Sequence, residues 1–511
     1  MVAFGCIIHF LLLLLHLFLQ TEASLVAVYS IQRHGARNVL RKGALLTEDA
    51  LVGGPTLLPE GQRQTYTAGV SFQNRYLNSS TCTATSTCLP GRRNGTKYGV
   101  LGQPGIGYGN FDVYVRSSAL DRSILSGLCF FNGIFPPDPT APTASSFVPT
   151  GAQVVPIYTQ SDDDDILIRA YTKCDTYQAN LMKWFSSQEF ADKAAESAPL
   201  RAQVQQMMPP DTNTSLTNWW NVYDSINVYQ TYGVGDPVPQ FNRTLFQKIQ
   251  DLAYWLETAK MRSNLTGNML GGVALADLVN YFQLAATGAT NGTKFYYKLL
   301  SLSGHYNTQL GILAALELDK WPGASNFTWL TSLPKLAAVL VFELHAADDR
   351  PPVVTAPSYY VRLVYQDGPA AQYDTVPLPC ASAAGAAAVG PGVCTLGDFL
   401  SYTSARALNS SLAWCSACSN FAPGACASAR LAALRAARGG DDGDGKNGGG
   451  DAEAWKVAVS VVVTFFGAVM LTAVAVWLWQ RRRHGGQEGG FGGSLTNLQT
   501  AEMAEYQKHS I

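Results

Sequence analysis

The feature that most constrains the fold is the first apolar segment after residue 24, together with the polar segment directly behind it. Residues Leu25 to Ile31 (LVAVYSI) form a largely apolar run that is rich in branched side chains. Such a run is typical of a strand covered on both faces, as in a parallel sheet with helices on each side. The polar segment QRHGAR comes next. Because open α/β sheets bind ligands at the carboxyl ends of their strands, the sequence predicts an α/β fold with a site just beyond Ile31.

Strand-like and helix-like patterns also occur on either side of a long helical stretch. Apolar residues recur at helical spacing in Gly61–Tyr76 and Leu120–Phe131, and strand-like runs occur at Phe111–Arg116, Val154–Tyr158, Ala338–Leu344 and Tyr360–Tyr365. The stretch at about 175–300 is dominated by helical patterns, and we expect its tryptophans to pack the core rather than to bind a ligand: Trp184, Trp219, Trp220 and Trp255. These patterns predict an α/β core with helices on both faces of the sheet, interrupted by a mainly helical lobe.

The two ends of the chain carry apolar segments of different kinds. Residues 1–23 have the apolar core and polar end of a cleavable signal peptide, with an uncleaved anchor as the alternative. Val457 to Trp479 has no charged residue, and at ~1.5 Å per residue it can cross ~30 Å of hydrocarbon. Its aromatic end precedes Arg481 to Arg483, which marks the cytoplasmic side, whereas a buried core helix is the alternative. We therefore expect a single-pass type I protein held in the lipid bilayer by one transmembrane helix at residues 457–479.

That topology divides the chain into an ectodomain at residues 24–430, a flexible Gly-rich and Asp-rich stalk at 431–456, and a cytoplasmic tail at 480–511. Asn-x-Ser/Thr sequons occur only on the N-terminal side of the predicted span, at Asn78, Asn94, Asn213, Asn242, Asn264, Asn291, Asn326 and Asn409. Their distribution agrees with a glycosylated ectodomain that is extracellular or lies in the endosomal or lysosomal lumen.

Cysteine usage fits an oxidising compartment. Of the ten cysteines, nine remain after the predicted signal peptide, and an odd number leaves one without a disulfide partner. Cys129 lies in an apolar run and is our choice for a buried free thiol, whereas Cys82 and Cys88 are expected to close a small loop. Cys415 and Cys418 have CxxC spacing, but no second such pair or His pair accompanies them, so we expect disulfide bonding rather than redox or zinc chemistry.

The charge of the chain argues against a nucleic-acid partner. The formal net charge is −1, which provides no basic surface for a polyanion. The acidic run Asp162 to Asp165 is expected to be a solvated loop, with cation binding as the alternative. His345, Asp348 and Asp349 are likewise expected in loops.

Three short segments carry residues that can bind an anion. Arg33 and Arg37 flank His34 directly after the first strand, and guanidinium groups can hold phosphate oxygens through paired hydrogen bonds. Arg116 ends a second predicted strand in VYVRSSALDR. His305 lies where SLSGHYNTQLGILAALEL changes from strand to helix, and the free N–H groups of a helix start attract anions. If QRHGAR is not simply an exposed basic loop, these side chains converge on one phosphate-like group, with His34 as its nucleophile.

With these motifs in view, the sequence resembles the histidine acid phosphatase family, a branch of the histidine phosphatase superfamily. Five blocks match in order over most of the predicted ectodomain: VYSIQRHGAR, LLPEGQRQTYTAGVSFQNRY, VYVRSSALDRSILSGLCFFNGIFPP, VVPIYTQSDDDDILIRAYTKC and SGHYNTQLGILAALEL. The predicted signal peptide, stalk and membrane span make the chain most similar to the membrane-bound and lysosomal acid phosphatases. The resemblance implies a histidine-phosphatase-like α/β core and hydrolysis of phosphate monoesters through a phosphohistidine.

The resemblance also implies a role for each matched residue. His34 would accept the phosphoryl group, Arg33, Arg37 and Arg116 would bind its oxygens, and His305 would donate a further hydrogen bond. No metal or other cofactor is implied, because the arginines supply the positive charge that phosphoryl transfer needs.

Disulfides and assembly are implied by the same resemblance. It pairs Cys380 with Cys394 and ties Cys174 to one of the C-terminal cysteines. It also implies a homodimer.

One position departs from the family and leaves the function open. Where the family has an Asp that protonates the leaving oxygen, or the pair Ala-Glu in a related branch, this chain has Tyr306 and Asn307. A positioned general acid contributes on the order of 10² to 10⁴ in rate. A phenol with a pKa of about 10 gives up its proton reluctantly, so alkyl phosphates should suffer more than aryl phosphates. Two functions therefore remain: an acid phosphatase with Tyr306 at the donor position, or a catalytically impaired member that binds phosphate or phosphoglycan or interacts with other proteins.

Overall fold

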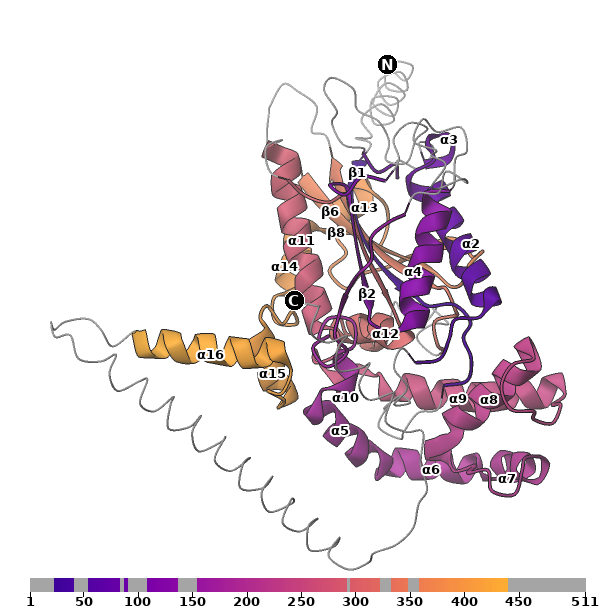
Figure 1. The fold of residues 1–511 in the computed structure, drawn as a ribbon. Coiled ribbons are helices and arrows are strands. Elements are labelled where there is room, and N and C mark those ends of the chain that lie inside the picture. Colours follow the sequence, from indigo (N-terminus) through magenta and orange to yellow (C-terminus); the bar gives the residue numbers. More distant parts are fainter. Residues whose placement is uncertain are drawn as a thin grey trace, which may run out of the picture. The chain divides into compact units, whose positions relative to one another are not determined.

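The computed structural model describes residues 23–40, 54–82, 87–90, 108–136, 154–291, 295–321, 332–347 and 358–439 (Figure 1). The predicted signal peptide up to residue 22, the predicted stalk beyond residue 439, the span at 457–479 and the tail at 480–511 lie outside these ranges, as do Asp348 and Asp349. The start of the predicted flexible stalk, residues 431–439, instead belongs to helix α16 (Gly424–Gly439). Within the ranges, no helix has the length and apolar character needed to cross a bilayer.

A single mixed sheet organises the described part of the chain. It has eight strands in the order β3-β2-β4-β1-β5-β6-β7, with β8 paired to β6. One half is parallel, and the other half is antiparallel. The parallel strands are β1 (Ala23–Arg33), β2 (Val113–Ser118), β3 (Tyr158–Gln160) and β4 (Leu299–Gly304), and the antiparallel strands are β5 (Val339–Ala347), β6 (Ser358–Gln366), β7 (Tyr373–Val376) and β8 (Cys394–Thr395).

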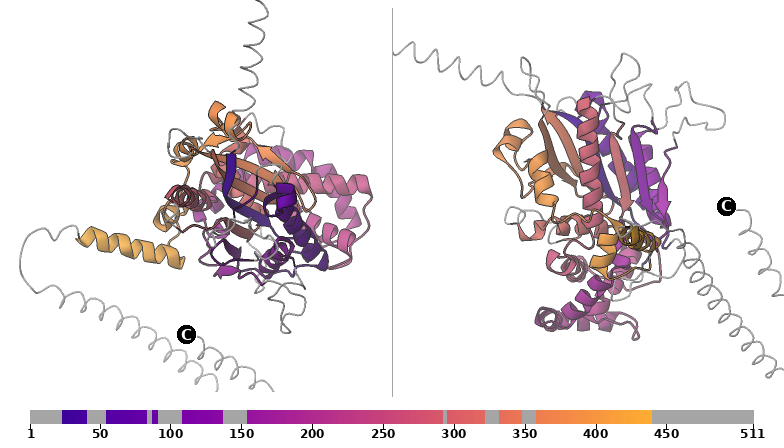
Figure 2. Two further views of the ribbon diagram at one scale, coloured as in Figure 1. Left: turned by 90° about the horizontal axis from the view of Figure 1, so that it is seen from above. Right: turned by 90° about the vertical axis from the view of Figure 1, so that its left-hand side faces the viewer.

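Helices cover both faces of this sheet, as predicted (Figures 1 and 2). On one face, α2 (Pro59–Tyr76) and α4 (Asp121–Ile134) pack Phe72 and Phe130 into the same core as Val341. The two helices approach so closely that a Cβ on Gly69 would lie 2.0 Å from the Phe130 carbonyl oxygen, so only glycine fits there. The opposite face is covered by α11 (Gly272–Asn291), α12 (Tyr306–Ala315) and α14 (Leu396–Thr403).

A run of helices separates β3 from β4. After the 3₁₀ turn at Ala170–Thr172, the chain forms α5 (Asp175–Phe185), α6 (Gln188–Glu196), α7 (Ala198–Met207), α8 (Trp219–Tyr232), α9 (Arg243–Lys260) and α10 (Ser263–Thr266) before α11. Local chemistry sets several of these ends. The side chain of Asn242 accepts a hydrogen bond from the Leu245 amide and begins α9, while Gly233, at φ 67°, ends α8.

One predicted strand is displaced. The run Val154–Tyr158 is strand-like in sequence, but β3 begins only at Tyr158. Pro156 lies inside the predicted run and has no amide hydrogen to donate to a neighbouring strand, so pairing with β2 starts after it.

The expected solvation of one residue and the expected loop position of another are wrong. Asp165 belongs to the acidic run that we expected to be solvated, but its side chain is buried and accepts hydrogen bonds from the Leu167 and Ile168 amides. His345 lies within β5 rather than in a loop, and its Nε2 is 3.0 Å from Glu343 Oε2. Arg116 pairs with Asp165, and Glu343 contacts His345, and the pattern along the chain reveals neither partner.

Four disulfide bonds are present in the described part of the chain. The predicted pairs Cys82–Cys88 and Cys380–Cys394 are confirmed, and Cys174 is bonded to Cys418. Cys415 is bonded to Cys426, so the CxxC cysteines hold different partners and form no redox pair with each other. Cys129 is free, as predicted, but half-buried rather than buried.

Candidate active site

The QRHGAR segment lies at the carboxyl end of β1, next to the end of β4. The His34 amide donates a hydrogen bond to the Gly304 carbonyl at 3.1 Å, which joins the two strand ends. The His34 ring is buried, with its Nδ1 2.8 Å from the Gly35 carbonyl oxygen. Because a carbonyl only accepts, Nδ1 must carry the proton in this contact. The neutral ring then presents the lone pair of its Nε2 nitrogen.

Positive charge surrounds His34 and holds it in the neutral form. Burial lowers the pKa of His34 well below its usual value of 6.5, and the charges of Arg122, His305, Arg33 and Arg37 lower it further. Both effects favour the neutral imidazole, whose unprotonated nitrogen is the nucleophilic form.

His305 lies directly behind β4, at the start of α12. Its ring centroid is 5.4 Å from that of His34, and its Nε2 is 3.0 Å from the Ser118 hydroxyl at the end of β2. The structure thus brings together the ends of β1, β2 and β4, as the three motifs predict.

Arg33 and Arg37 are both buried and both anchored. One Arg33 nitrogen donates to the Pro334 carbonyl, and burial lowers the pKa of this guanidinium. Arg37 Nη1 lies 2.8 Å from Asp224 Oδ2, on helix α8. These contacts fix the position of each guanidinium before any anion binds.

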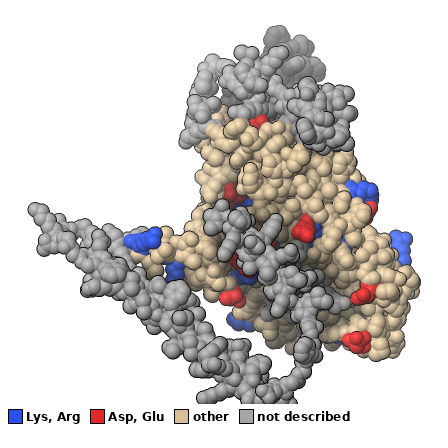
Figure 3. Space-filling model, in the orientation of Figure 1, with Lys and Arg blue, Asp and Glu red and all other residues tan. Residues whose placement is uncertain are grey.

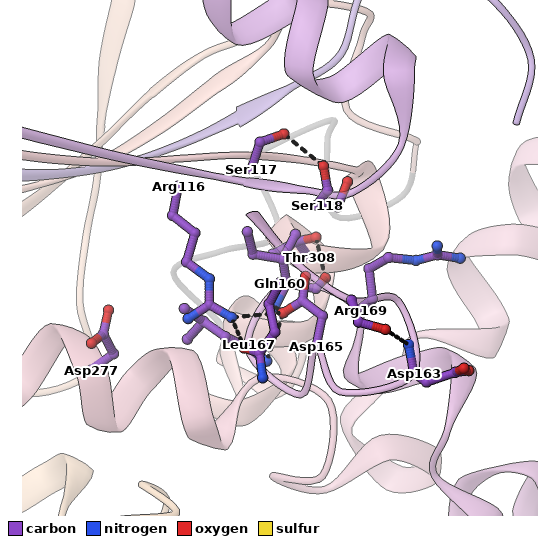
Figure 4. Close-up of polar contacts among 12 residues, drawn as sticks. Arg116, Ser117, Ser118, Gln160, Asp163, Asp165, Leu167, Arg169, Asp277 and Thr308 are labelled. Atoms are coloured by element: carbon purple, nitrogen blue, oxygen red, sulfur yellow. Dashed lines mark hydrogen bonds and ion pairs between the residues drawn. The ribbon is translucent and has the colours of Figure 1, made fainter. Parts of the chain in front are cut away.

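The guanidinium of Arg116 points toward two side chains other than His34. Its Nη2 donates to Gln160 and lies 3.3 Å from Asp165 Oδ1, and Figure 4 shows its guanidinium pointing toward these two residues. The backbone of β2 nevertheless passes the site, because Ser118, two residues later, contacts His305. Of the predicted residues, Arg33, His34, Arg37 and His305 are therefore gathered, while the Arg116 side chain is held by the Gln160 and Asp165 side chains.

A fourth arginine contributes that the sequence reasoning did not assign. Arg122, in the first turn of α4, is fully buried, and its charge is the strongest of those that lower the pKa of His34. It lies in the block VYVRSSALDR that first drew attention to Arg116. Spacing gave no reason to prefer it, because a charged residue at a helix start is usually solvated.

Tyr306 does not offer its hydroxyl to this cluster. The hydroxyl donates to Glu257 Oε2 at 2.6 Å, and Glu257 Oε1 is 2.7 Å from Lys260 Nζ. Burial raises the pKa of Tyr306 well above 10, and the Glu257 charge raises it further. The sequence could not predict these partners on α9, because they lie some fifty positions away and carry no motif.

A cavity of about 260 Å³ opens beside the arginines. Its lining includes Arg33, Arg37 and Asp224 together with four aromatic residues of helices α8 and α9, which are Trp220, Tyr223, Tyr232 and Tyr254. Trp184 and Trp219 are core residues as expected, but Trp220, although buried, also lines this cavity. On the part of the described surface that Figure 3 shows, the charged side chains are scattered, whereas Arg33 and Arg37 are buried.

Comparisons with known proteins identify relatives of low sequence identity. Lysosomal acid phosphatase of Rattus norvegicus is 26% identical over 309 residues, which cover 58% of this chain and 63% of that protein. Human prostatic acid phosphatase is 22% identical over 219 residues, covering 41% and 53%. The chain thus matches less than two thirds of the length of these relatives. The apo structure of Hafnia alvei phytase is similar with a TM-score of 0.47 and 16% identity, over 78% of this chain and 98% of the phytase.

A family model settles the assignment at the level of the superfamily. The model described as histidine phosphatase superfamily (branch 2) matches residues 24–366, which include all three strand ends described above. The chain therefore belongs to branch 2 of the histidine phosphatase superfamily.

Proposed function

We propose that this protein is a membrane-anchored acid phosphatase that hydrolyses phosphate monoesters through a phosphohistidine on His34. The observation that carries the proposal is the state of His34: a buried, neutral imidazole whose Nδ1 is engaged with a carbonyl and whose Nε2 is left for attack. Nucleophilic catalysis requires such an activated nitrogen, and the surrounding arginines supply charge where the phosphoryl oxygens would lie.

In the proposed reaction the Nε2–P bond forms as the bond between phosphorus and the leaving oxygen breaks. Arg33, Arg37 and Arg122 stabilise the equatorial oxygens, and His305 donates a hydrogen bond to one of them. Water then attacks the phosphohistidine, which releases phosphate and restores the neutral imidazole. These phosphate-binding side chains form an anion clamp. Arg116 joins them by exchanging its contacts with Gln160 and Asp165 for a contact with a phosphate oxygen.

The surroundings of the protein belong to the same proposal. The span at 457–479 anchors the ectodomain, residues 24–430, in the bilayer, and the ectodomain works at the cell surface or in an endolysosomal lumen. The sequons on that side, the disulfides and the resemblance to lysosomal relatives support this placement. A homodimer is the assembly that we propose.

A second candidate rests on a specific contact. Since the Tyr306 hydroxyl is bonded to Glu257, no side chain at the usual donor position faces a leaving group. A chain that kept the anion clamp without turnover would bind phosphate or phosphoglycans as a receptor or interaction protein.

The test is phosphate release by the full-length protein, purified in detergent, from an aryl phosphate at about pH 5. Turnover that disappears in His34→Asn supports the phosphatase. Binding of inorganic phosphate without any turnover supports the receptor.

A further inference from the structure

The cavity beside Arg33 and Arg37 carries information about the organic part of the substrate. Arg33 and Arg37 both belong to its lining, so the organic group of an ester whose phosphoryl oxygens they bind can lie in this cavity. Its walls include Trp220 and Tyr223 on α8 and Tyr254 on α9. They are therefore positioned to contact whatever group leaves.

The aromatic wall is held in a fixed arrangement. The ring centroids of Trp220 and Tyr223 are 5.6 Å apart, as are those of Tyr223 and Tyr254. Gln250 Nε2 donates to the Tyr223 hydroxyl at 2.9 Å and to the Tyr254 hydroxyl at 3.3 Å. A wall of mutually packed rings with anchored hydroxyls binds a planar apolar group at little entropic cost.

Charge limits the ligand to one phosphate. Among the described residues that line the cavity, the cationic side chains are Arg33, Arg37 and Lys335. Arg37 is paired with Asp224, which also lines the cavity, and Lys335 Nζ lies 3.0 Å from Asp367. A ligand with several phosphates would need several such cations, and the walls supply rings instead.

The volume fits one substituted ring. An apolar cavity of about 150 Å³ is known to accommodate benzene. At about 260 Å³, the present cavity leaves room for a ring with a short substituent.

The chemistry of residue 306 independently favours an aromatic leaving group. The Tyr306 hydroxyl donates to Glu257 and supplies no proton to a leaving oxygen. An alkoxide is too basic to depart without a proton, whereas a phenoxide, whose conjugate acid has a pKa of about 10, can depart with the electron pair of the P–O bond and take its proton from water.

We infer that this cavity is the leaving-group site and that the substrates are singly phosphorylated aromatic esters. The inference rests on the proposed phosphatase function and narrows it to one substrate class. Trp220, Tyr223 and Tyr254 are its specificity-determining residues. The site is built from buried and half-buried side chains of α8, α9 and the QRHGAR segment, so the arginines that would bind the phosphoryl group and the rings that would contact the leaving group line the same cavity.

The experiment compares three esters with the full-length protein: O-phosphotyrosine, 2-phosphoglycerol and inositol hexakisphosphate. We expect kcat/KM for the aryl ester to exceed that for the alkyl ester by about 10² or more, the contribution of an absent general acid. Tyr223→Ala should raise KM for the aryl ester about tenfold, leave KM for the alkyl ester within about twofold, and be rescued by Tyr223→Phe. Tyr229→Ala, on the same helix but outside the cavity lining, is the matched control.

Binding of non-hydrolysable phosphonates tests the leaving-group cavity separately from the phosphatase proposal. Phenylphosphonate should bind at least about tenfold more tightly than ethylphosphonate, and Tyr223→Ala should remove the difference. Equal turnover of aryl and alkyl esters, or equal phosphonate affinities, overturns the inference and leaves the phosphatase proposal standing. Selective binding of phenylphosphonate without turnover of any ester supports the inferred cavity and overturns the phosphatase proposal.

Discussion

The hydroxyl of Tyr306 lies 2.6 Å from Glu257 Oε2, and the Arg33 guanidinium carbon lies 5.0 Å from the centroid of the same ring. Tyr306 therefore links a buried carboxylate on α9 to Arg33, one of the arginines that we propose bind the phosphoryl group. A ring beneath a guanidinium stabilises its charge and fixes its plane. We therefore expect Tyr306, which lacks the acidity of a proton donor, to affect the site by positioning Arg33.

Tyr306→Asp tests whether Tyr306 positions Arg33 or whether the site only lacks a general acid at this position. An Asp side chain here would leave a cavity and place a second carboxylate near the buried Glu257. We expect the free energy of unfolding to fall by roughly 3–5 kcal/mol, and no rescue of alkyl phosphate turnover. Adding Glu257→Gln should recover part of the stability. Thermal unfolding and turnover of both ester classes measure these effects, and a gain on alkyl esters with normal stability contradicts the positioning role.

Tyr306→Phe and Tyr306→Leu separate the hydroxyl from the ring. Phe keeps the ring under Arg33 but leaves Glu257 Oε2 without this donor, which should cost about 1–3 kcal/mol of stability. Leu also removes the ring, so KM for an aryl phosphate should rise several-fold more than in the Phe variant while kcat changes less. Steady-state kinetics at one pH make the comparison. Equal KM values in the two variants rule out support of Arg33 by the ring.

Asp224→Asn should weaken phosphate binding. Asp224 Oδ2 accepts from Arg37 and from the Leu40 amide, both at 2.8 Å, so it fixes the guanidinium and the adjoining loop. Asn retains the shape but not the charge, and we expect the inhibition constant of inorganic phosphate to rise about tenfold. Asp251→Asn, exposed on α9, serves as the control. If both variants bind phosphate like the wild type, Arg37 needs no anchor.

The acid limb of the pH profile should depend on Arg122. Burial and nearby positive charges keep the pKa of His34 well below 6.5, so activity should extend to lower pH than an ordinary histidine nucleophile would allow. Removing one positive charge with Arg122→Gln favours protonation of His34, which shifts the acid limb of kcat/KM to higher pH. Arg122→Lys keeps the charge and should shift it less. An acid limb that does not move in Arg122→Gln places the limiting proton elsewhere.

Stability in acid should depend on Glu343, far from the clamp. Burial acts to raise the pKa of Glu343, but the charges of Arg362 and Arg75 outweigh it and hold that pKa well below its usual range. A depressed carboxylate pKa contributes stability above the unfolded value of about 4.3 that is lost only as the pH falls through the folded value. Glu343→Gln should therefore lower the unfolding free energy by roughly 3–5 kcal/mol at pH 5 to 7. The difference should shrink at strongly acidic pH, and a constant difference down to pH 2 contradicts the ionic origin.

Local patterns were sufficient for much of the architecture. The apolar run at Leu25–Ile31 became the central strand β1, and the change of period in SLSGHYNTQLGILAALEL became the junction of β4 and α12. These features are readable because side-chain period follows directly from strand and helix geometry. The convergence of Arg33, His34, Arg37 and His305 followed from the rule that parallel strands end at one edge.

Contacts between segments far apart in the chain could not be predicted from the sequence. Glu257 and Lys260 support Tyr306, Asp224 supports Arg37, and Gln160 and Asp165 hold Arg116. Each of these partners lies on an element that the sequence alone could not place against its counterpart. The sequence does not distinguish a buried ionisable side chain from a solvated one. The burial of Asp165 and the strand position of His345 were therefore not predicted.

The most direct test of the central claim is to trap the phosphorylated residue. Full-length protein is mixed with a ³²P-labelled aryl phosphate at about pH 5, denatured rapidly and digested. We expect a phosphoryl group on the peptide that contains His34, labile to acid and stable to alkali, and absent from His34→Asn. Phosphate release without labelling of this peptide, or labelling that persists in His34→Asn, would contradict it.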